Sequence, residues 1–142
     1  MAKQMTAGEI ESLLNEQYEG TLMVVDEDKP YGVVCWYCFD GKDIWLGLLP
    51  HGRKFVCMKK NPNAAFTVFK VSDDGWSSAF AEGSIEQVRD REGILIGMKL
   101  AAEKYKVPQE VLEAQVEKSS KNPDKSMTFR IKVDRLTGRK SY

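Results

Sequence analysis

The stretch YGVVCWYCFDGKDIWLGLL, residues 31–49, carries the clearest sequence signal for the fold. The turn signal Asp-Gly-Lys at residues 40–42 separates two apolar runs, which predicts a hairpin of antiparallel strands at Tyr31–Phe39 and Asp43–Leu49. In the first strand, both sets of alternating side chains are apolar. A strand without a polar face indicates a barrel wall covered on its outside, or a subunit interface.

The segments on either side of this hairpin extend the pattern. Thr6 followed by Glu9 is a capping box that begins a helix. Further strands are predicted at 21–25, 63–71, 76–88 and 126–136, and further helices at 52–60, 90–105 and 108–119. Because most strands follow one another through tight turns, they favour antiparallel pairing. The expected fold is mainly β (α+β), a six-stranded antiparallel barrel with peripheral helices that forms a dimer.

Chain length, net charge and cysteine count limit the kinds of function that the protein could have. The 142 residues are expected to form a single domain. The 21 Lys and Arg balance the 21 Asp and Glu, so the formal net charge is zero and argues against nucleic acid or an anionic membrane as partner. No apolar run is long enough to span a membrane, and the first residues are polar. With three cysteines, an odd number, the expected location is the reducing cytoplasm.

The basic motif HGRK at residues 51–54 lies at the junction of a predicted strand and a predicted short helix. Gly52 lets a ligand approach the backbone, Arg53 offers a planar fork of donors and Lys54 adds a compact charge. At a helix N-terminus these residue types form a phosphate site. The alternative is a solvated basic turn, which the three letters GRK taken alone favour.

The ordered set of features resembles a known family. The strand at 31–49 is followed by HGRKFVCMKKNPNAAFTVF, then GWSSAFAEGSIEQV, then MTFRIKVDRLTGR. From about Ile10 to Arg139, the chain resembles the pyridoxamine 5′-phosphate oxidase-like proteins, the flavin-binding split barrels. It is most similar to the short branch of nitroimidazole-resistance proteins and general-stress flavoproteins. The resemblance implies a split barrel, a homodimer and an FMN at each subunit interface.

The resemblance also implies site residues. Arg53 and Lys54 match the family's phosphate-binding pair, and the strand 32–37 matches the one that lines the cofactor. Gly47 and Leu48 match the pair that ends the next strand, and Ser78 falls where the oxidases carry a glutamine. The expected cofactor-binding residues from the motif and the resemblance are Val33, Val34, Cys35, Trp36, Gly47, Leu48, His51, Gly52, Arg53, Lys54, Trp76 and Ser78.

Departures from the family pattern limit the expected activity. Gly32 and Tyr37 stand where the oxidases carry basic residues, and DRLTGRKSY lacks their arginine- and tryptophan-bearing substrate segment. We therefore do not expect oxidation of pyridoxamine 5′-phosphate. A helical insert at about 89–119, typical of the short branch, is expected to shape the pocket mouth.

The expected function is an FMN-dependent oxidoreductase that reduces a small organic electron acceptor of the nitro or quinone type. No catalytic acid or base is evident. One alternative is a non-catalytic flavin-binding or stress-response protein. Others are a deazaflavin- or haem-binding relative on the same barrel, since sequence alone does not separate these cofactors.

Two rival readings concern the cysteines and the histidine. CWYC has the spacing of a redox motif, but on a strand Cys35 and Cys38 point to opposite faces, so we expect structural thiols. Cys57 is expected in the core or an interface. His51 is the only histidine, and a metal site needs several ligands, so no metal is expected. It remains open whether His51 faces the phosphate, donates a proton or is a plain exposed residue.

Overall fold

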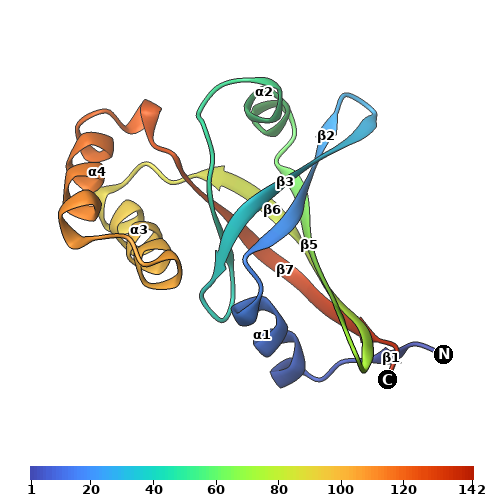
Figure 1. The fold of residues 1–142 in the computed structure, drawn as a ribbon. Coiled ribbons are helices and arrows are strands. Elements are labelled where there is room, and N and C mark those ends of the chain that lie inside the picture. Colours follow the sequence, from blue (N-terminus) through green and yellow to red (C-terminus); the bar gives the residue numbers. More distant parts are fainter.

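The computed structural model describes all residues from Met1 to Tyr142 (Figure 1). The elements are β1 (Lys3–Gln4), α1 (Ala7–Glu16), β2 (Glu19–Asp26), β3 (Lys29–Phe39), β4 (Ile44–Gly47), α2 (Arg53–Lys60), β5 (Asn63–Ser72), β6 (Gly75–Gln87), α3 (Arg91–Tyr105), α4 (Gln109–Lys121), the 3-10 turn η1 (Pro123–Lys125) and β7 (Thr128–Lys140). None of the helices has the length and apolar character needed to cross a bilayer.

Six strands close into a ring in the order β7-β4-β3-β2-β5-β6, with β6 pairing back to β7. Every pairing is antiparallel. Strand β7 closes the ring because its first residues pair with β4 while nearly its whole length pairs with β6. The predicted six-stranded antiparallel barrel is confirmed. The two-residue β1, which extends the sheet beside the end of β7, was not predicted.

Helices cover the two ends of the barrel (Figure 1). The α1 helix begins with the predicted capping box, in which Thr6 and Glu9 bond each other's backbone N–H groups. Its apolar stripe ends in Leu14, which is 1% exposed, and the Tyr37 hydroxyl donates to the Leu14 carbonyl at 2.6 Å. At the other end, α2 buries Cys57 and Met58 in the same core. The barrel interior is therefore closed, apolar and hydrogen-bonded where it is polar.

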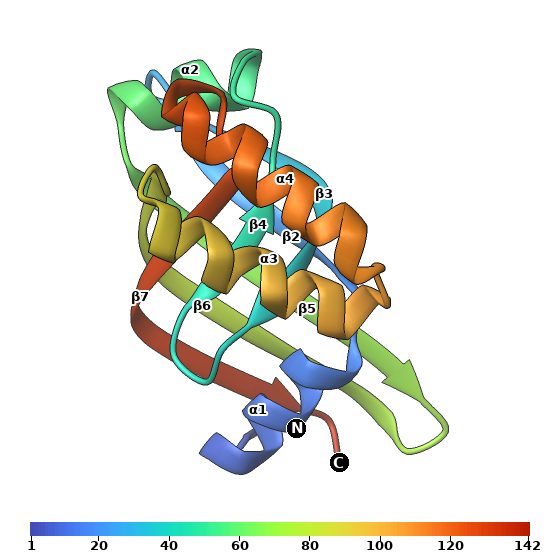
Figure 2. The same ribbon diagram turned by 90° about the vertical axis from the view of Figure 1, so that its left-hand side faces the viewer.

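The helical insert stands beside the barrel rather than on its ends. Figure 2 shows α3 and α4 side by side in front of the sheet. A second small core of Cys38, Trp45, Val88 and Ile94 joins this hairpin to the barrel wall. Gly97 allows the approach, since a Cβ there would lie 2.6 Å from Thr128 Cγ2 and 2.9 Å from Trp45 Cε3.

All six predicted barrel strands are present, and their boundaries differ from the predictions by up to four residues, most at the end of β7. β4 has only four residues. At its start the Asp43 side chain accepts the Val133 N–H, and past its end only the hydrogen bond from the Leu48 N–H to the Met127 carbonyl continues the pairing with the segment before β7. β7 continues to Lys140, well past the predicted end at residue 136, because β1 and β6 both pair with its last residues.

Candidate functional site

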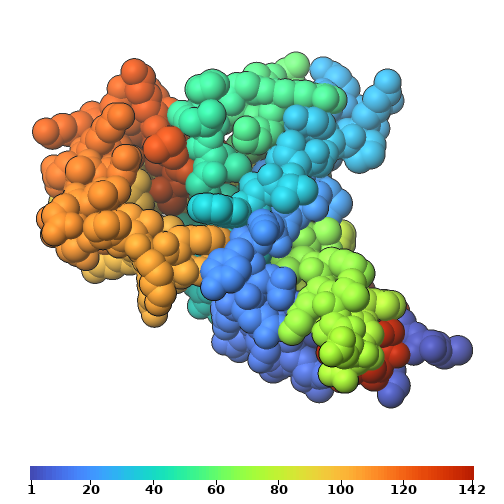
Figure 3. Space-filling view, in the orientation of Figure 1, coloured from blue at the N-terminus to red at the C-terminus, as the bar shows by residue number.

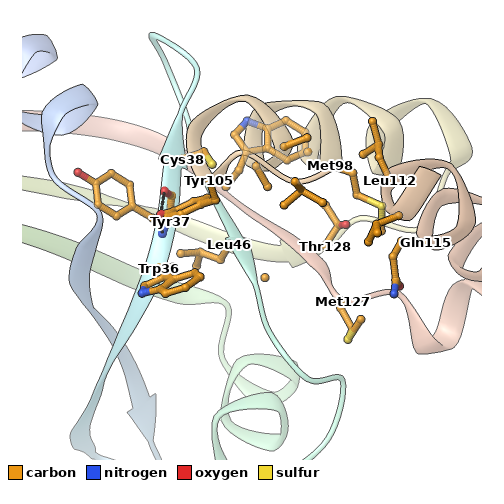
Figure 4. A pocket seen from close by; sticks show the side chains of 17 residues that line it. Trp36, Tyr37, Cys38, Leu46, Met98, Tyr105, Leu112, Gln115, Met127 and Thr128 are labelled. Atoms are coloured by element: carbon orange, nitrogen blue, oxygen red, sulfur yellow. Dashed lines mark hydrogen bonds between the residues drawn. The ribbon is translucent and has the colours of Figure 1, made fainter. Parts of the chain in front are cut away.

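A cleft separates the helical hairpin from the barrel wall (Figure 3). Its volume is about 310 Å³, and most of its lining is hydrophobic. The barrel contributes β3, β4 and the first residues of β7, while the hairpin contributes α3 and α4 (Figure 4). Trp36 and Gly47 belong to this lining, so two of the predicted cofactor-binding residues lie together in the cleft.

The C-terminal end of α3 forms hydrogen bonds with β3, at the point where the pairing between β2 and β3 has ended. The β2–β3 ladder stops at Trp36, and the Tyr105 hydroxyl then accepts from the Tyr37 N–H at 3.1 Å and donates to the Tyr37 carbonyl at 2.7 Å. The Lys104 ammonium donates to the same carbonyl at 3.1 Å. The Tyr105 ring also stacks on Trp36, with centroids 4.9 Å apart and planes 8° from parallel. These contacts hold one end of the cleft in place.

Burial at this junction shifts two pKa values. Desolvation raises the pKa of Tyr105 to about 12, so its hydroxyl keeps its proton at neutral pH. Desolvation also lowers the pKa of the Lys104 ammonium from its usual value. Neither residue was among the predicted site residues. Lys104 and Tyr105 bond a residue more than 65 positions away in the sequence, so a local sequence pattern could not predict these hydrogen bonds to Tyr37.

The start of α2 has the features of an anion site. Gly52 caps the helix with φ 91° and ψ −175°, a region of backbone space that is essentially restricted to glycine. No side chain caps the helix, and no group in the chain accepts the N–H groups of Arg53, Lys54 and Phe55. A Cβ placed on Gly52 would meet no atom within 4 Å, so the space beside Gly52 is open.

The two cations of the motif differ in their environment. Arg53 is exposed, forms an ion pair with Asp26 at 2.7 Å and lies 3.8 Å from the centre of the Tyr31 ring. The ion pair with Asp26 raises the pKa of the Arg53 guanidinium further. Lys54 is half-buried and has no ion-pair partner in the chain. Lys54 is therefore the cation left free for a ligand.

The other predicted residues are distributed over three surfaces. His51 is exposed beside Gly52, and Leu48 is buried in the core. Val33 and Cys35 are half-buried and pack against the barrel core, whereas Val34 is 72% exposed on the outer face. The side of β3 that was expected to be covered is therefore open in the single chain.

An apolar strip runs over the outer face of the barrel. Strand register places Val34 of β3 and Phe80 of β6 in one row through Thr21 and Thr67, and Phe69 of β5 lies on the same face. We call Val34, Trp36, Phe69, Val71 and Phe80 the outer strip; all five side chains are exposed.

Trp76 and Ser78 lie at the far end of the barrel from α2. Trp76 follows the β5–β6 turn, at the opposite end of the barrel in Figure 1, where its ring stacks on Phe69 with centroids 6.3 Å apart. Ser78 pairs with Phe69 and Arg139 across the sheet. Within one chain, neither residue lies in the cleft lining.

The cysteines are structural, as predicted. Cys35 packs against the barrel core and Cys38 belongs to the second core, so the two thiols lie on opposite faces of β3. Desolvation raises the pKa of each of these two thiols to about 11, which disfavours the thiolate that redox chemistry requires. Cys57 is buried in the barrel core.

One cleft residue that the sequence did not single out is Gln115 of α4. Its Oε1 atom is the one buried side-chain nitrogen or oxygen without a hydrogen-bond partner. The sequence indicated that the helical insert at about 89–119 borders the pocket, and α3 and α4 do line the cleft. It did not indicate which residues of the insert would do so. A helical stripe at Ile94, Met98, Ala101 and Tyr105 was the available sequence signal for the α3 wall.

The barrel, the helical hairpin and the cleft between them define the class of protein. The sequence model of the family described as pyridoxamine 5′-phosphate oxidase matches residues 6–140. The chain therefore belongs to this family, and the resemblance stated from the sequence is confirmed. No curated protein matches the chain significantly.

Solved structures share the fold. A conserved hypothetical protein from Mycobacterium tuberculosis has 26% identity and a TM-score of 0.76, with 93% of this chain and 82% of that chain covered. An FAD-binding protein from Mesorhizobium loti has 22% identity and a TM-score of 0.71, with 100% and 99% covered. A candidate 5-nitroimidazole antibiotic resistance protein from Bacteroides thetaiotaomicron has 18% identity and a TM-score of 0.76, with 98% and 87% covered.

Proposed function

We propose that this protein is an FMN-binding flavoprotein that reduces a small organic electron acceptor. The observation that carries the proposal is the start of α2, where three free backbone N–H groups follow a glycine-only conformation and Lys54 has no ion-pair partner. A phosphate monoester satisfies all of these groups at once. The similar structure from Mesorhizobium loti is described as FAD-binding, which supports a flavin as the ligand.

The chain's own residues would bind and orient the cofactor. The N–H groups of α2 and the Lys54 ammonium hold the phosphate, and the exposed backbone and side chains at Val34 and Trp36 offer an apolar surface to the ring. A bound flavin supplies the electron-transfer chemistry, which needs no catalytic dyad from the protein. The cleft beside Trp36 and Gly47 leaves room for a second molecule next to this surface.

We further propose a homodimer with the cofactor at the subunit interface. The outer strip leaves Val34 72%, Val71 69% and Phe69 59% exposed on one face of the sheet, which is the kind of surface that a partner covers. Because Trp76 and Ser78 lie far from the cleft of their own chain, they would reach a cofactor only from a second copy.

A titration of the purified protein with FMN and with FAD, followed by flavin fluorescence, tests the proposal. We expect FMN to bind with micromolar or better affinity, one per chain, to a species that light scattering shows to be a dimer. Turnover of reduced nicotinamide with a quinone or nitro compound then separates an oxidoreductase from a non-catalytic flavin carrier. Absence of binding of either flavin, or a monomer that binds flavin fully, would contradict the proposed site.

A further inference from the structure

The side chain of Gln115 has a buried oxygen that forms no hydrogen bond within the chain. Its Oε1 atom is buried and accepts no hydrogen bond, and its Nε2 atom donates none within the chain. Elsewhere, buried side-chain oxygens are bonded, as the Tyr37 hydroxyl is to the Leu14 carbonyl. Native proteins leave few buried polar atoms unpaired, because such an atom loses its water without gaining a partner.

No donor of the protein bonds Gln115 Oε1, and the side chains next to it are apolar. Met98, Leu112 and Met127 lie on the same side of the cleft as Gln115 (Figure 4). Thioether and alkyl groups cannot donate a hydrogen bond. The Oε1 acceptor can be satisfied from the cleft side, by water or by a ligand that displaces it.

The shape of the cleft restricts what that ligand can be. A volume of about 310 Å³ is at the small end of ligand pockets. The stacked pair of Trp36 and Tyr105 belongs to the lining, and the remaining lining is mostly apolar. A flat aromatic ring system with one polar substituent matches this combination.

We propose that the cleft is a substrate pocket for a flat aromatic quinone or nitro compound that also carries a hydroxyl or amino group, and that Gln115 Oε1 accepts the hydrogen bond of that hydroxyl or amino group. The proposal rests on the proposed function only in identifying this molecule as the electron acceptor. Trp36 and Gly47 line the cleft and are also predicted cofactor-binding residues, so a molecule in the cleft would lie beside the cofactor.

A stability measurement separates a ligand-binding role from a structural one. Replacing Gln115 with an apolar side chain of similar size removes the desolvated Oε1 acceptor without breaking a hydrogen bond within the chain. We therefore expect Gln115→Leu to raise the melting temperature by roughly 2–4 °C. An unchanged or lower melting temperature would show that the amide supports the fold, and would overturn the proposal.

A matched pair of ligands tests the hydrogen bond itself. 2-Naphthol and 2-methoxynaphthalene share the ring system, but only the first can donate. In calorimetric titrations of the flavin-loaded protein we expect 2-naphthol to bind about tenfold more tightly, and Gln115→Leu to abolish the difference. Gln109→Leu serves as the control, because Gln109 is on the same helix but its amide donates to Glu113 outside the cleft lining. Equal affinities in the wild type, or no binding of 2-naphthol, would overturn the proposal.

Repeating the titration without flavin distinguishes the two proposals. Binding of 2-naphthol only to flavin-free protein would assign the cleft to the flavin ring, which overturns the substrate pocket while flavin binding stands. If the protein takes up no FMN, the proposed function fails. The tenfold preference and its loss in Gln115→Leu would then still support the pocket. Ala101→Phe, which fills the cleft from α3, should abolish binding of both naphthalenes; binding that persists would place them elsewhere and contradict the pocket.

Discussion

The barrel interior and the cleft beside it are both lined mainly by apolar side chains, but they differ in how completely these side chains are buried and how completely polar atoms are hydrogen-bonded. In the barrel, Phe66, Phe129 and Leu22 are at most 1% exposed, and the buried Tyr37 hydroxyl has a partner. In the cleft, Trp36 is 64% and Val111 47% exposed, and a buried amide oxygen has none. The barrel is packed for stability, whereas the cleft keeps apolar surface and hydrogen-bonding capacity unused. This difference indicates that binding occurs beside the barrel and not inside it.

The largest expected effect is the loss of stability caused by a cavity in the barrel core. Phe129→Ala removes a ring that is 0% exposed and touches Phe55 edge-on, so we expect a loss of ~3–5 kcal/mol in the free energy of unfolding. The matched cleft variant Val111→Ala should cost less than ~1 kcal/mol. Urea denaturation of both variants checks the comparison. Similar costs at the two positions would show that the cleft is packed as tightly as the barrel.

The junction between the two regions depends on Gly97. A Cβ at this position overlaps Thr128 and Trp45, so Gly97→Ala should destabilise the protein by a net ~1–2 kcal/mol despite the better helix propensity of alanine. Gly8→Ala in α1 is the control, because the nearest atom to its Cβ would be 4.0 Å away. Gly8→Ala should be neutral or stabilising. A neutral Gly97→Ala would mean that α3 can move away from the barrel without cost.

Removal of the cations at the start of α2 should weaken the ligand and leave the fold intact. We expect Arg53→Ala/Lys54→Ala to lower the affinity for FMN at least tenfold, or ~1.4 kcal/mol. Lys54→Ala should account for most of the loss, because Arg53 is already paired with Asp26. Flavin fluorescence titration gives both values, with Lys59→Ala in the last turn of α2 as the control. Unchanged affinity in the double variant would refute the phosphate site.

The smallest effect concerns pH. The folded-state pKa values of Cys35 and Cys38 are raised from 9.0 to about 11, so the folded protein keeps protons that the unfolded chain releases. The stability from these thiols is complete below pH 9 and is lost as the pH rises toward 11, at ~1 kcal/mol per thiol by pH 10. The lowered pKa of Lys104 acts in the opposite direction.

Comparing the wild type with Cys35→Ala/Cys38→Ala isolates the thiols, since Lys104 is present in both proteins. The free energy of unfolding, measured by urea denaturation from pH 8 to pH 10, should fall more steeply in the wild type. Parallel pH profiles would contradict the raised thiol pKa values.

Local patterns were sufficient to predict the elements of the barrel. The Asp-Gly-Lys turn and the apolar runs on either side of it predict β3 and β4, and Thr6 with Glu9 predicts α1; the structure contains all three elements. Gly52 was assigned to the helix start from its position before two cations, and its backbone conformation agrees. These features depend on residues close together in the sequence.

Tertiary contacts account for what the sequence did not predict. Pairing of Arg53 with Asp26 joins residues 27 positions apart and leaves Lys54 as the free cation. The bonds from Tyr105 to Tyr37 and the orphaned amide of Gln115 exist only because the helical hairpin folds over β3. The amphipathic pattern of a helix indicates that one face is buried, but not which strand it covers or which polar atom remains unsatisfied.

The first measurement to make is the visible absorption spectrum of the purified protein, with mass analysis of the molecule released by heat. We expect flavin absorption bands and a released molecule with the mass of FMN. A released FAD would keep the flavin site but revise its ligand. A colourless protein that also fails to take up added FMN would contradict the assignment of the α2 N-terminus as a flavin-phosphate site.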